Sequence, residues 1–269
     1  MPAQMAQKSI QPTITWIGHA TFLIQIGGLN ILTDPIFFEL SRFFAPRLMP
    51  CPLSLEKLPP IDIILVSHNH VDHLDHATIC TLKLLGHNPT ILAPSGNKDW
   101  FMRRGFSKVY EKTWWEKHAQ DDFVFTCLPA NHWSGRNLLD TNKTLWGSWM
   151  IAYKGFHIYF AGDSAYDIHF SQIKKAYPSI NVALMPIAPN DPHPLIKVSH
   201  INAYEAFKAF HDLGAQQFIP MHWGTFLFEQ SQFDHSINLI SELWEKQHQK
   251  LTGQILKILK IGQSCRFDL

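Results

Sequence analysis

Three histidines and two aspartates lie within eight consecutive positions of the sequence. They are, in order, His68, His70, Asp72, His73 and Asp75. Neutral imidazole nitrogens and carboxylate oxygens are ligands for zinc and related metal ions. His68 and His70 are two positions apart, so an extended backbone would turn both side chains to one face. The residue types and their spacing therefore predict a metal site.

The elements that would position these side chains can also be predicted. Ile61 to Val66, directly before the cluster, is short, apolar and β-branched, which is typical of a buried strand. Three further predicted strands also end next to a potential ligand, at His132, Asp163 and His222. Packing holds the end of a strand still, while the loop beyond leaves a metal open to substrate. We therefore expect the four strand ends to form one site.

The chain reads as several hairpin strands followed by strand–helix alternation, and this order occurs twice. Gly27-Gly28 and Lys154-Gly155 are typical of hairpin turns, and Asp75, Ser95 and Asn202 are typical helix N-caps. A helix is also predicted from Ser231 to about Gln247. Two sheets packed face to face, with helices outside, would bury these strands, so we predict an α+β fold.

Length and composition indicate one globular domain over residues 1–269, because no linker or low-complexity tract divides the chain. Hydrophobic residues make up 46% and charged residues 17%, which fits a large core. The net charge of +1, without a Lys/Arg cluster, gives no reason to expect a nucleic-acid partner.

The cysteines and the N-terminus suggest a cytoplasmic protein. The four cysteines lie far apart and form no C-x-x-C pair, so we expect reduced thiols at Cys51, Cys80, Cys127 and Cys265. Residues 1–13 are polar and predict neither a signal peptide nor an anchor, and the apolar runs are too short to cross a bilayer. Any membrane contact would be peripheral, and a homodimer is left open.

The motif set resembles the metallo-β-lactamase fold superfamily over nearly the whole chain. The resemblance rests on His-x-His-x-Asp-His at residues 68–73, followed by His132, Asp163 and His222. It implies a four-layer αββα sandwich with a dinuclear metal site at one edge of the two sheets. Two Zn²⁺ ions per chain are implied, with other divalent metals as alternatives. His68, His70 and His132 would hold the first ion, Asp72, His73 and His222 the second, and Asp163 would bridge both.

A narrower resemblance is to the N-acylphosphatidylethanolamine-hydrolysing phospholipase D family. It rests on segments that metal chemistry does not require: residues 30–37, Trp114-Trp115-Glu116, Asn131-His132-Trp133-Ser134, residues 145–149, Phe160-Ala161-Gly162-Asp163 and residues 222–226. The sequence departs from that family at Ser164-Ala165-Tyr166, in the loop from Pro189 to Leu195, and in lacking a long N-terminal extension. These departures leave the metal ligands intact and bear on the lipid substrate.

The resemblance implies an enzyme that hydrolyses a phosphodiester of a glycerophospholipid. A metal-bridging hydroxide would attack phosphorus, Asp72 and Asp163 would position it, and His200 would assist the developing charge or the leaving oxygen. For His200 a structural role is an equal alternative. The rival functions are another metal-dependent hydrolase on this fold, of sugar-phosphate lactonase type, and a non-hydrolytic di-iron redox protein.

Several neighbouring residues have simpler interpretations. Asp75 is expected to cap a helix, Asp34 either to orient a ligand histidine or to cap, and His19 to be a partly buried, hydrogen-bonded histidine. Lys197 and Arg136 are candidates for phosphate contact or for plain solvation. The aromatic side chains Phe37, Phe38, Phe43 and Phe44 are predicted to lie in the core rather than to face lipid. Surface positions are expected for His169, His193, His235 and His248.

Overall fold

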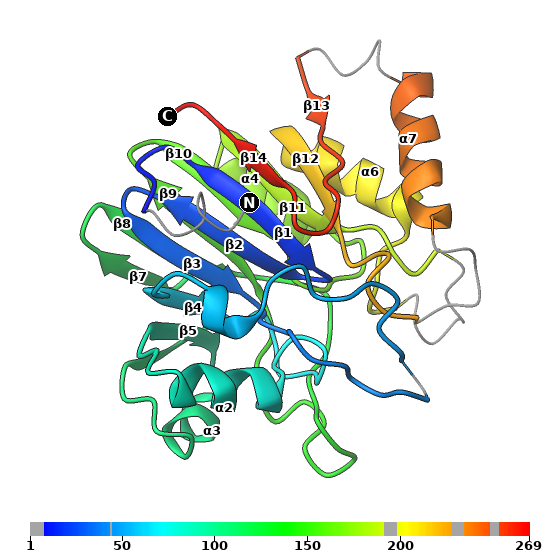
Figure 1. Cartoon of the computed structure of the whole chain (residues 1–269). Coiled ribbons are helices and arrows are strands. Elements are labelled where there is room, and N and C mark those ends of the chain that lie inside the picture. Colours follow the sequence, from blue (N-terminus) through cyan, green and yellow to red (C-terminus); the bar gives the residue numbers. More distant parts are fainter. Residues whose placement is uncertain (1–7, 44, 191–197, 228–233, 248–252) are drawn as a thin grey trace. The chain divides into compact units, whose positions relative to one another are not determined.

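The computed structural model describes residues 8–43, 45–190, 198–227, 234–247 and 253–269 (Figure 1). The Cα positions divide the chain into two compact units, each with one sheet. The first unit comprises Met1–Thr113, Trp133–Trp146 and Leu259–Leu269, and the second unit comprises Trp114–His132 and Gly147–Ile258. Since both units are assembled from separate stretches of chain, the domain assignment of residues 1–269 stays a prediction.

The first unit contains a seven-stranded mixed sheet in the order β14-β1-β2-β3-β4-β5-β6. Antiparallel pairs join β14, β1, β2 and β3, whereas β3 to β6 are parallel. Gly27 and Gly28 connect β2 to β3 with φ angles of 56° and 80°, which confirms the predicted hairpin. The strands are β1 (Thr13–Gly18), β2 (Thr21–Ile26), β3 (Leu29–Thr33), β4 (Ile63–Leu65), β5 (Thr90–Pro94), β6 (Val109–Lys112) and β14 (Ser264–Arg266).

Two α-helices, α2 (His76–Leu84) and α3 (Lys98–Met102), and a 3₁₀ turn, η1 (Leu55–Lys57), complete the first unit (Figure 1). The Asp75 carboxylate accepts hydrogen bonds from the backbone N–H groups of residues 77 and 78, as predicted for an N-cap. Ile79 and Leu82 of α2 and Phe101 of α3 lie in one apolar core with Ile64 of β4. Burial of these side chains fixes the end of β4. It thereby also fixes the start of the loop from Ser67 to Asp75, called the histidine-rich loop below.

The second unit contains another seven-stranded mixed sheet, in the order β13-β12-β11-β10-β9-β8-β7. Strands β7 to β10 are antiparallel and β10 to β13 are parallel. Lys154 and Gly155 form the predicted turn between β9 and β10 with positive φ angles. The strands are β7 (Lys117–Gln120), β8 (Phe123–Leu128), β9 (Ser148–Tyr153), β10 (Phe156–Phe160), β11 (Ile180–Pro186), β12 (Ala215–Met221) and β13 (Ile255–Leu256).

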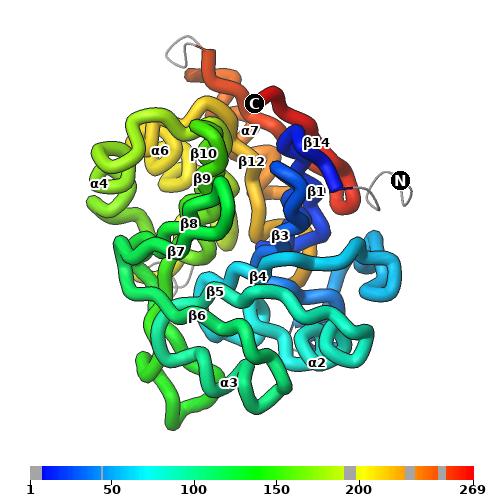
Figure 2. The backbone as a smooth tube through the Cα atoms, turned by 90° about the vertical axis from the view of Figure 1, so that its left-hand side faces the viewer, coloured from blue at the N-terminus to red at the C-terminus, as the bar shows by residue number. Residues whose placement is uncertain are grey.

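The helices among the described residues of the second unit are α4 (His169–Ala176), α6 (Ala203–Leu213) and α7 (His235–Gln247). Figure 2 shows α4 and α6 side by side. The predicted cap of α6 is confirmed: Asn202 and Glu205 form a reciprocal capping box, and Gly214 ends the helix in the left-handed region. The predicted start of the last helix at Ser231 lies outside the described residues, and α7 begins at His235.

Some predicted elements differ from the structure. The helix expected from Ser95 begins only after Asn97, which takes the N-cap position without a side-chain cap hydrogen bond. Three short strands, β6, β7 and β14, were not predicted. Each lies at the end of its sheet and carries charged residues, so it lacks the alternating apolar pattern from which a strand is recognised.

Candidate metal site and its supporting residues

In the first unit the candidate ligands are positioned by the carboxyl ends of two parallel strands. Thr33 of β3 pairs with Leu65 of β4, so Asp34 and Ser67 lie at the same edge of the sheet. Asp34 accepts hydrogen bonds from Ser67 N at 2.7 Å and from Ser67 Oγ at 2.5 Å. Its Oδ2 also lies 2.7 Å from Nδ1 of His73. Asp34 is fully buried, and its φ angle of 29° is positive, which is uncommon for a residue with a side chain.

The partners of the two buried histidines define which ring nitrogen faces the candidate site. A carboxylate can only accept, so His73 donates from Nδ1 to Asp34 and turns Nε2 towards Oδ2 of Asp72, 3.6 Å away. His68 has Ser67 Oγ at 2.8 Å from Nδ1, and its Nε2 lies 2.8 Å from Nδ1 of His70. Asp34 therefore orients His73, one of the two roles expected for it. Burial raises the pKa of Asp34, and the hydrogen bonds from His73 and Ser67 oppose that rise.

The donor set of the first unit fits a divalent metal of the zinc type. Two imidazole nitrogens of His68 and His70 point at one another, and Asp72 and His73 supply a carboxylate oxygen and a third imidazole. Donor atoms of Asp34, His68 and His73 lie within 4.8 Å of one another. His19 is buried, and its Nε2 lies 3.2 Å from Asp72 Oδ2, which confirms the expected hydrogen-bonded histidine. Imidazole and carboxylate together are the ligand chemistry of zinc sites.

In the second unit three strands that run in one direction end in the other candidate ligands. Strands β8, β10 and β12 share a direction, and His132, Asp163 and His222 follow their carboxyl ends. Oδ2 of Asp163 lies 3.3 Å from Nε2 of His222 and 3.9 Å from Nε2 of His132. His222 has a φ of 65°, unusual for a residue with a side chain. The structure thus brings the predicted ligands together as two groups, one in each unit.

Hydrogen bonds between residues distant in the sequence fix the His132 side chain and the backbone next to His132 and Asp163. His132 Nδ1 lies 2.7 Å from the carbonyl oxygen of Ser199, so that carbonyl accepts from Nδ1 and Nε2 faces Asp163. The backbone N–H of Asn131 donates to Ser164 Oγ at 2.9 Å, and the N–H of Ala165 donates to the Asn131 carbonyl at 2.7 Å. These bonds hold the ends of β8 and β10 side by side.

His200 lies within this second group. Its Nδ1 is 3.6 Å from Asp163 Oδ2, and its ring is 5.0 Å from the ring of His132 and 5.8 Å from that of His222. Its side chain retains 19% exposure, whereas that of Asp163 retains 1%. A partly exposed imidazole beside a buried carboxylate can contact both the ligand group and a bound substrate.

His169, predicted to lie at the surface, is buried. Its Nε2 lies 3.2 Å from Ser164 Oγ, and burial lowers its pKa to about 4, with Asp167 opposing the effect. His169, Phe170 and Ile173 are the buried residues of α4. His169 thus shares the buried face of the helix with two apolar side chains, and this helical spacing was the sequence signal for the burial of His169. His235 is exposed, as predicted, whereas His193 and His248 lie outside the described residues.

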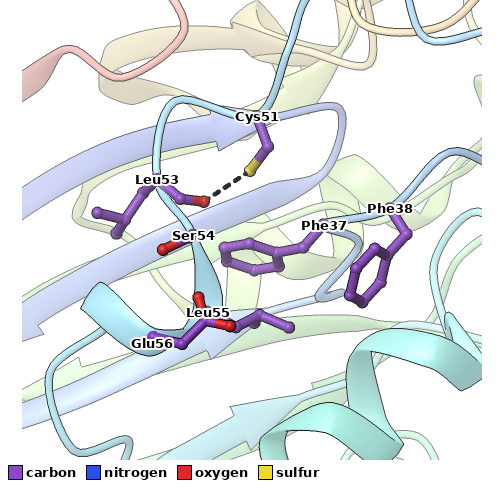
Figure 3. Close-up of a pocket in the computed structure, with 7 residues that line it drawn as sticks. All are labelled: Phe37, Phe38, Cys51, Leu53, Ser54, Leu55 and Glu56. Carbon is purple, nitrogen blue, oxygen red and sulfur yellow. Dashed lines mark hydrogen bonds between the residues drawn. The ribbon is translucent and has the colours of Figure 1, made fainter.

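The aromatic segment before β4 is only partly in the core. Phe37 is buried, but Phe38 is 42% and Phe43 88% exposed, so the core prediction is wrong for these two; Phe44 lies outside the described residues. A hollow of about 280 Å³ lies beside this segment (Figure 3), with walls formed by Phe37, Phe38, Cys51, Leu53, Ser54, Leu55 and Glu56. The hollow has an apolar wall of aromatic and leucine side chains and shares no residue with the histidine groups.

Three residues around the histidine-rich loop had not been predicted to support it: Asn69, Trp133 and Gly135. The Trp133 ring lies 4.2 Å from the ring of His70, and the Gly135 N–H donates to Asn69 Oδ1 at 2.7 Å. No local pattern signals these contacts, because Asn69 and Gly135 are 66 positions apart. Lys197, a predicted phosphate contact, lies outside the described residues.

These observations agree with comparisons against known proteins. The β-lactamase superfamily domain matches the chain over residues 29–223, and the chain belongs to this family. The archaeal metallo hydrolase Igni18 from Ignicoccus hospitalis has the same fold, with a TM-score of 0.74, 19% identity, and coverage of 96% of this chain and 99% of that one. The predicted α+β, metallo-β-lactamase-like fold is therefore confirmed.

Within the family, the chain is 37% identical over 235 residues to a Saccharomyces cerevisiae protein, the mitochondrial N-acyl-phosphatidylethanolamine-hydrolyzing phospholipase D. The match covers 81% of this chain and 49% of the yeast protein, so the chain spans about half the length of that relative. The predicted resemblance is thereby confirmed. The fold also occurs in CmlA, a diiron β-hydroxylase from Streptomyces venezuelae, with a TM-score of 0.72, 16% identity, and coverage of 97% and 55%.

Among the described residues, no helix has the length and apolar character needed to span a membrane. The four cysteines all lie within the described residues, and no disulfide bond joins them.

Proposed function

We propose that this chain is a zinc-dependent phosphodiesterase of phospholipase D type, which hydrolyses N-acylphosphatidylethanolamine-like glycerophospholipids. The observation that carries the proposal is the complete imidazole and carboxylate set at the strand ends, in a chain similar to the yeast phospholipase D. The fold alone would not select this activity, since a diiron hydroxylase shares it.

Two zinc ions are proposed to be held by the seven predicted ligands. His68, His70 and His132 would bind one ion, Asp72, His73 and His222 the other, and Asp163 would bind both. The tautomers described above support this assignment, because Asp34 and the Ser199 carbonyl occupy the opposite ring nitrogens of His73 and His132. When bound, zinc would act as a Lewis acid on the phosphoryl oxygens and lower the pKa of water.

The chain's own residues would then orient the reacting groups. Oδ2 of Asp72 and Oδ2 of Asp163 would accept hydrogen bonds from the attacking water and fix its direction. His200 would donate a hydrogen bond to a phosphoryl oxygen, or a proton to the oxygen that leaves with the N-acylethanolamine. Its partial exposure beside Asp163 supports this role.

The proposal extends to location and assembly. We propose a cytoplasmic protein. We also propose that it contacts membrane lipid peripherally, because Phe43, Leu138 and Leu139 of the first unit are 82% or more exposed. The protein should sediment together with vesicles of phosphatidylethanolamine and phosphatidylglycerol. The variant in which all three residues are replaced by Ser should stay in the supernatant. A homodimer is tested by light scattering at several protein concentrations.

The activity is tested by incubating zinc-loaded protein with a panel of phospholipids in water enriched in ¹⁸O. Attack at phosphorus with phospholipase D cleavage should give N-acylethanolamine and ¹⁸O-labelled phosphatidic acid by mass spectrometry. If the label appeared instead in phosphorylated N-acylethanolamine, released together with diacylglycerol, the phospholipase D assignment would be rejected. No turnover of any phosphodiester would also reject it. Parallel assays with a sugar-phosphate lactone, and metal analysis for iron with oxygen consumption, detect the two rival functions.

A further inference from the structure

The histidine-rich loop is tied at both ends by one side chain that is distant in sequence. Nη1 of Arg136 donates to the carbonyl oxygen of Asn69 at 2.9 Å and to the carbonyl oxygen of Leu74 at 2.7 Å. Three proposed ligands, His70, Asp72 and His73, lie between the two bonded carbonyls. Arg136 therefore closes the stretch of backbone that carries these ligands.

The loop has little regular structure of its own to hold it. Within it, the N–H groups of His73 and Leu74 both donate to the carbonyl of His70, at 3.1 and 2.8 Å, which forms one turn. This turn fixes the spacing of residues 70–74 but leaves the orientation of the turn to outside contacts. Asp34 contacts His73 and His19 contacts Asp72 from one side. The other contacts come from residues 133–136: Trp133 against the His70 ring, Gly135 N–H to Asn69 Oδ1, and Arg136 to the two carbonyls.

The Arg136 guanidinium is placed too specifically to be a solvated surface group. It is partly buried, its carbon lies 5.2 Å from the centre of the Trp100 ring, and Arg104 stacks on the same ring at 3.6 Å. Burying a cation near a second cation is unfavourable unless hydrogen bonds compensate for lost water. The two loop carbonyls provide that compensation, which is a different role from the phosphate contact considered from the sequence.

We propose that Arg136 is a positioning residue for metal binding: by joining the carbonyls of Asn69 and Leu74 it preorganises His70, Asp72 and His73. The inference rests on the proposed metal site and adds a residue that is not among the proposed ligands. Residues that support metal ligands in this way change metal affinity by roughly 10–100-fold when they are replaced.

The test compares Arg136→Gln, Arg136→Lys and the control Arg104→Gln. Arg104 shares the Trp100 ring but donates to the Trp100 carbonyl and to His76, not to the loop. Zinc affinity is measured by competition with a chromogenic chelator, and hydrogen exchange is measured on the metal-free protein. Arg136→Gln should weaken zinc binding about 10–100-fold and speed exchange of the amides of His73 and Leu74. Arg136→Lys should fall in between, because an ammonium lacks the planar fork.

Arg104→Gln should leave both readouts near wild type. Unchanged zinc affinity and unchanged loop exchange in both Arg136 variants would overturn the positioning role while leaving the proposed function intact. Equal loss in Arg104→Gln would also overturn it, by showing that the Trp100 region acts only through general stability. If the wild-type chain failed to compete with the chelator at all, the proposed metalloenzyme function would fail, and this inference with it. Arg136→Lys keeps the test decisive if Arg136→Gln does not fold.

Discussion

Oδ2 of Asp34 lies 2.7 Å from Nδ1 of His73, and both side chains are fully buried. This pair sets the tautomer of a proposed metal ligand, because a carboxylate accepts from Nδ1–H and leaves Nε2 to face Asp72. Asp34 comes from the end of β3 and His73 from the loop after β4. The parallel pairing of these two strands therefore brings the residues together.

The first prediction concerns this tautomer. In Asp34→Asn the amide can donate to Nδ1, which would place the His73 proton on Nε2 and remove a ligand atom. We expect zinc affinity to fall roughly 10–100-fold, measured by chelator competition, with the ring tautomer followed by ¹⁵N NMR. The matched control is Asp122→Asn, since Asp122 pairs with exposed Lys154 at the surface. Wild-type affinity in Asp34→Asn would show that the pair does not set the ligand.

The second prediction concerns the carboxylate proposed to bridge the metals. Asp163→Asn and His70→Ala should each reduce bound metal and lower the hydrolysis rate on the order of 10²–10³-fold or more, since metal ions supply several kcal/mol of charge stabilisation. Far-ultraviolet circular dichroism should stay near wild type, because neither side chain belongs to the apolar cores. Full activity of Asp163→Asn would eliminate the two-metal mechanism.

The third prediction separates catalysis from structure at His200. His200→Ala should lower the rate about 10²–10⁴-fold, the range for general acid–base groups, while metal content by mass spectrometry stays near normal. Its pH–rate profile should also lose one limb. His211→Ala is the control, because His211 lies in the last turn of α6. Metal loss in His200→Ala, with the remaining metal-bound fraction fully active, would instead make His200 a supporting residue.

The fourth prediction concerns pH and stability. Burial lowers the pKa of His169 from 6.5 to about 4, so between these values the unfolded chain binds the proton and the folded chain does not. The free energy of unfolding therefore keeps its full value with respect to this group above pH 6.5. It decreases by about 3 kcal/mol as the pH falls to about 4.

Urea unfolding at pH 4.5, 5.5 and 7 measures this effect. The difference in unfolding free energy between wild type and His169→Gln should shrink steadily as the pH falls, since the variant has no imidazole to protonate. The exposed His235→Gln serves as the surface control. A constant difference for His169→Gln would show that His169 is not neutral in the folded chain.

The candidate ligands, helix caps and hairpin turns of this protein could be predicted from its sequence, because each depends on residues close together in the chain. The ligand residues, the Asp75 cap, the capping box at Asn202 and the turn at Gly27-Gly28 all follow from spacings of a few residues. The expected ligands also sit at strand ends, since a buried strand followed by polar residues is itself a local pattern.

Contacts between residues far apart in the chain could not be predicted from local patterns. Asp34 and His73 are 39 positions apart, and Arg136 and Leu74 are 62 apart. Neither pair has a local signal, because sheet order and the return of residues 133–136 to the loop determine which side chains meet. Residue types and spacing identify the candidate metal ligands. The fold determines which partners orient them, since hydrogen bonds form wherever it brings donor and acceptor together.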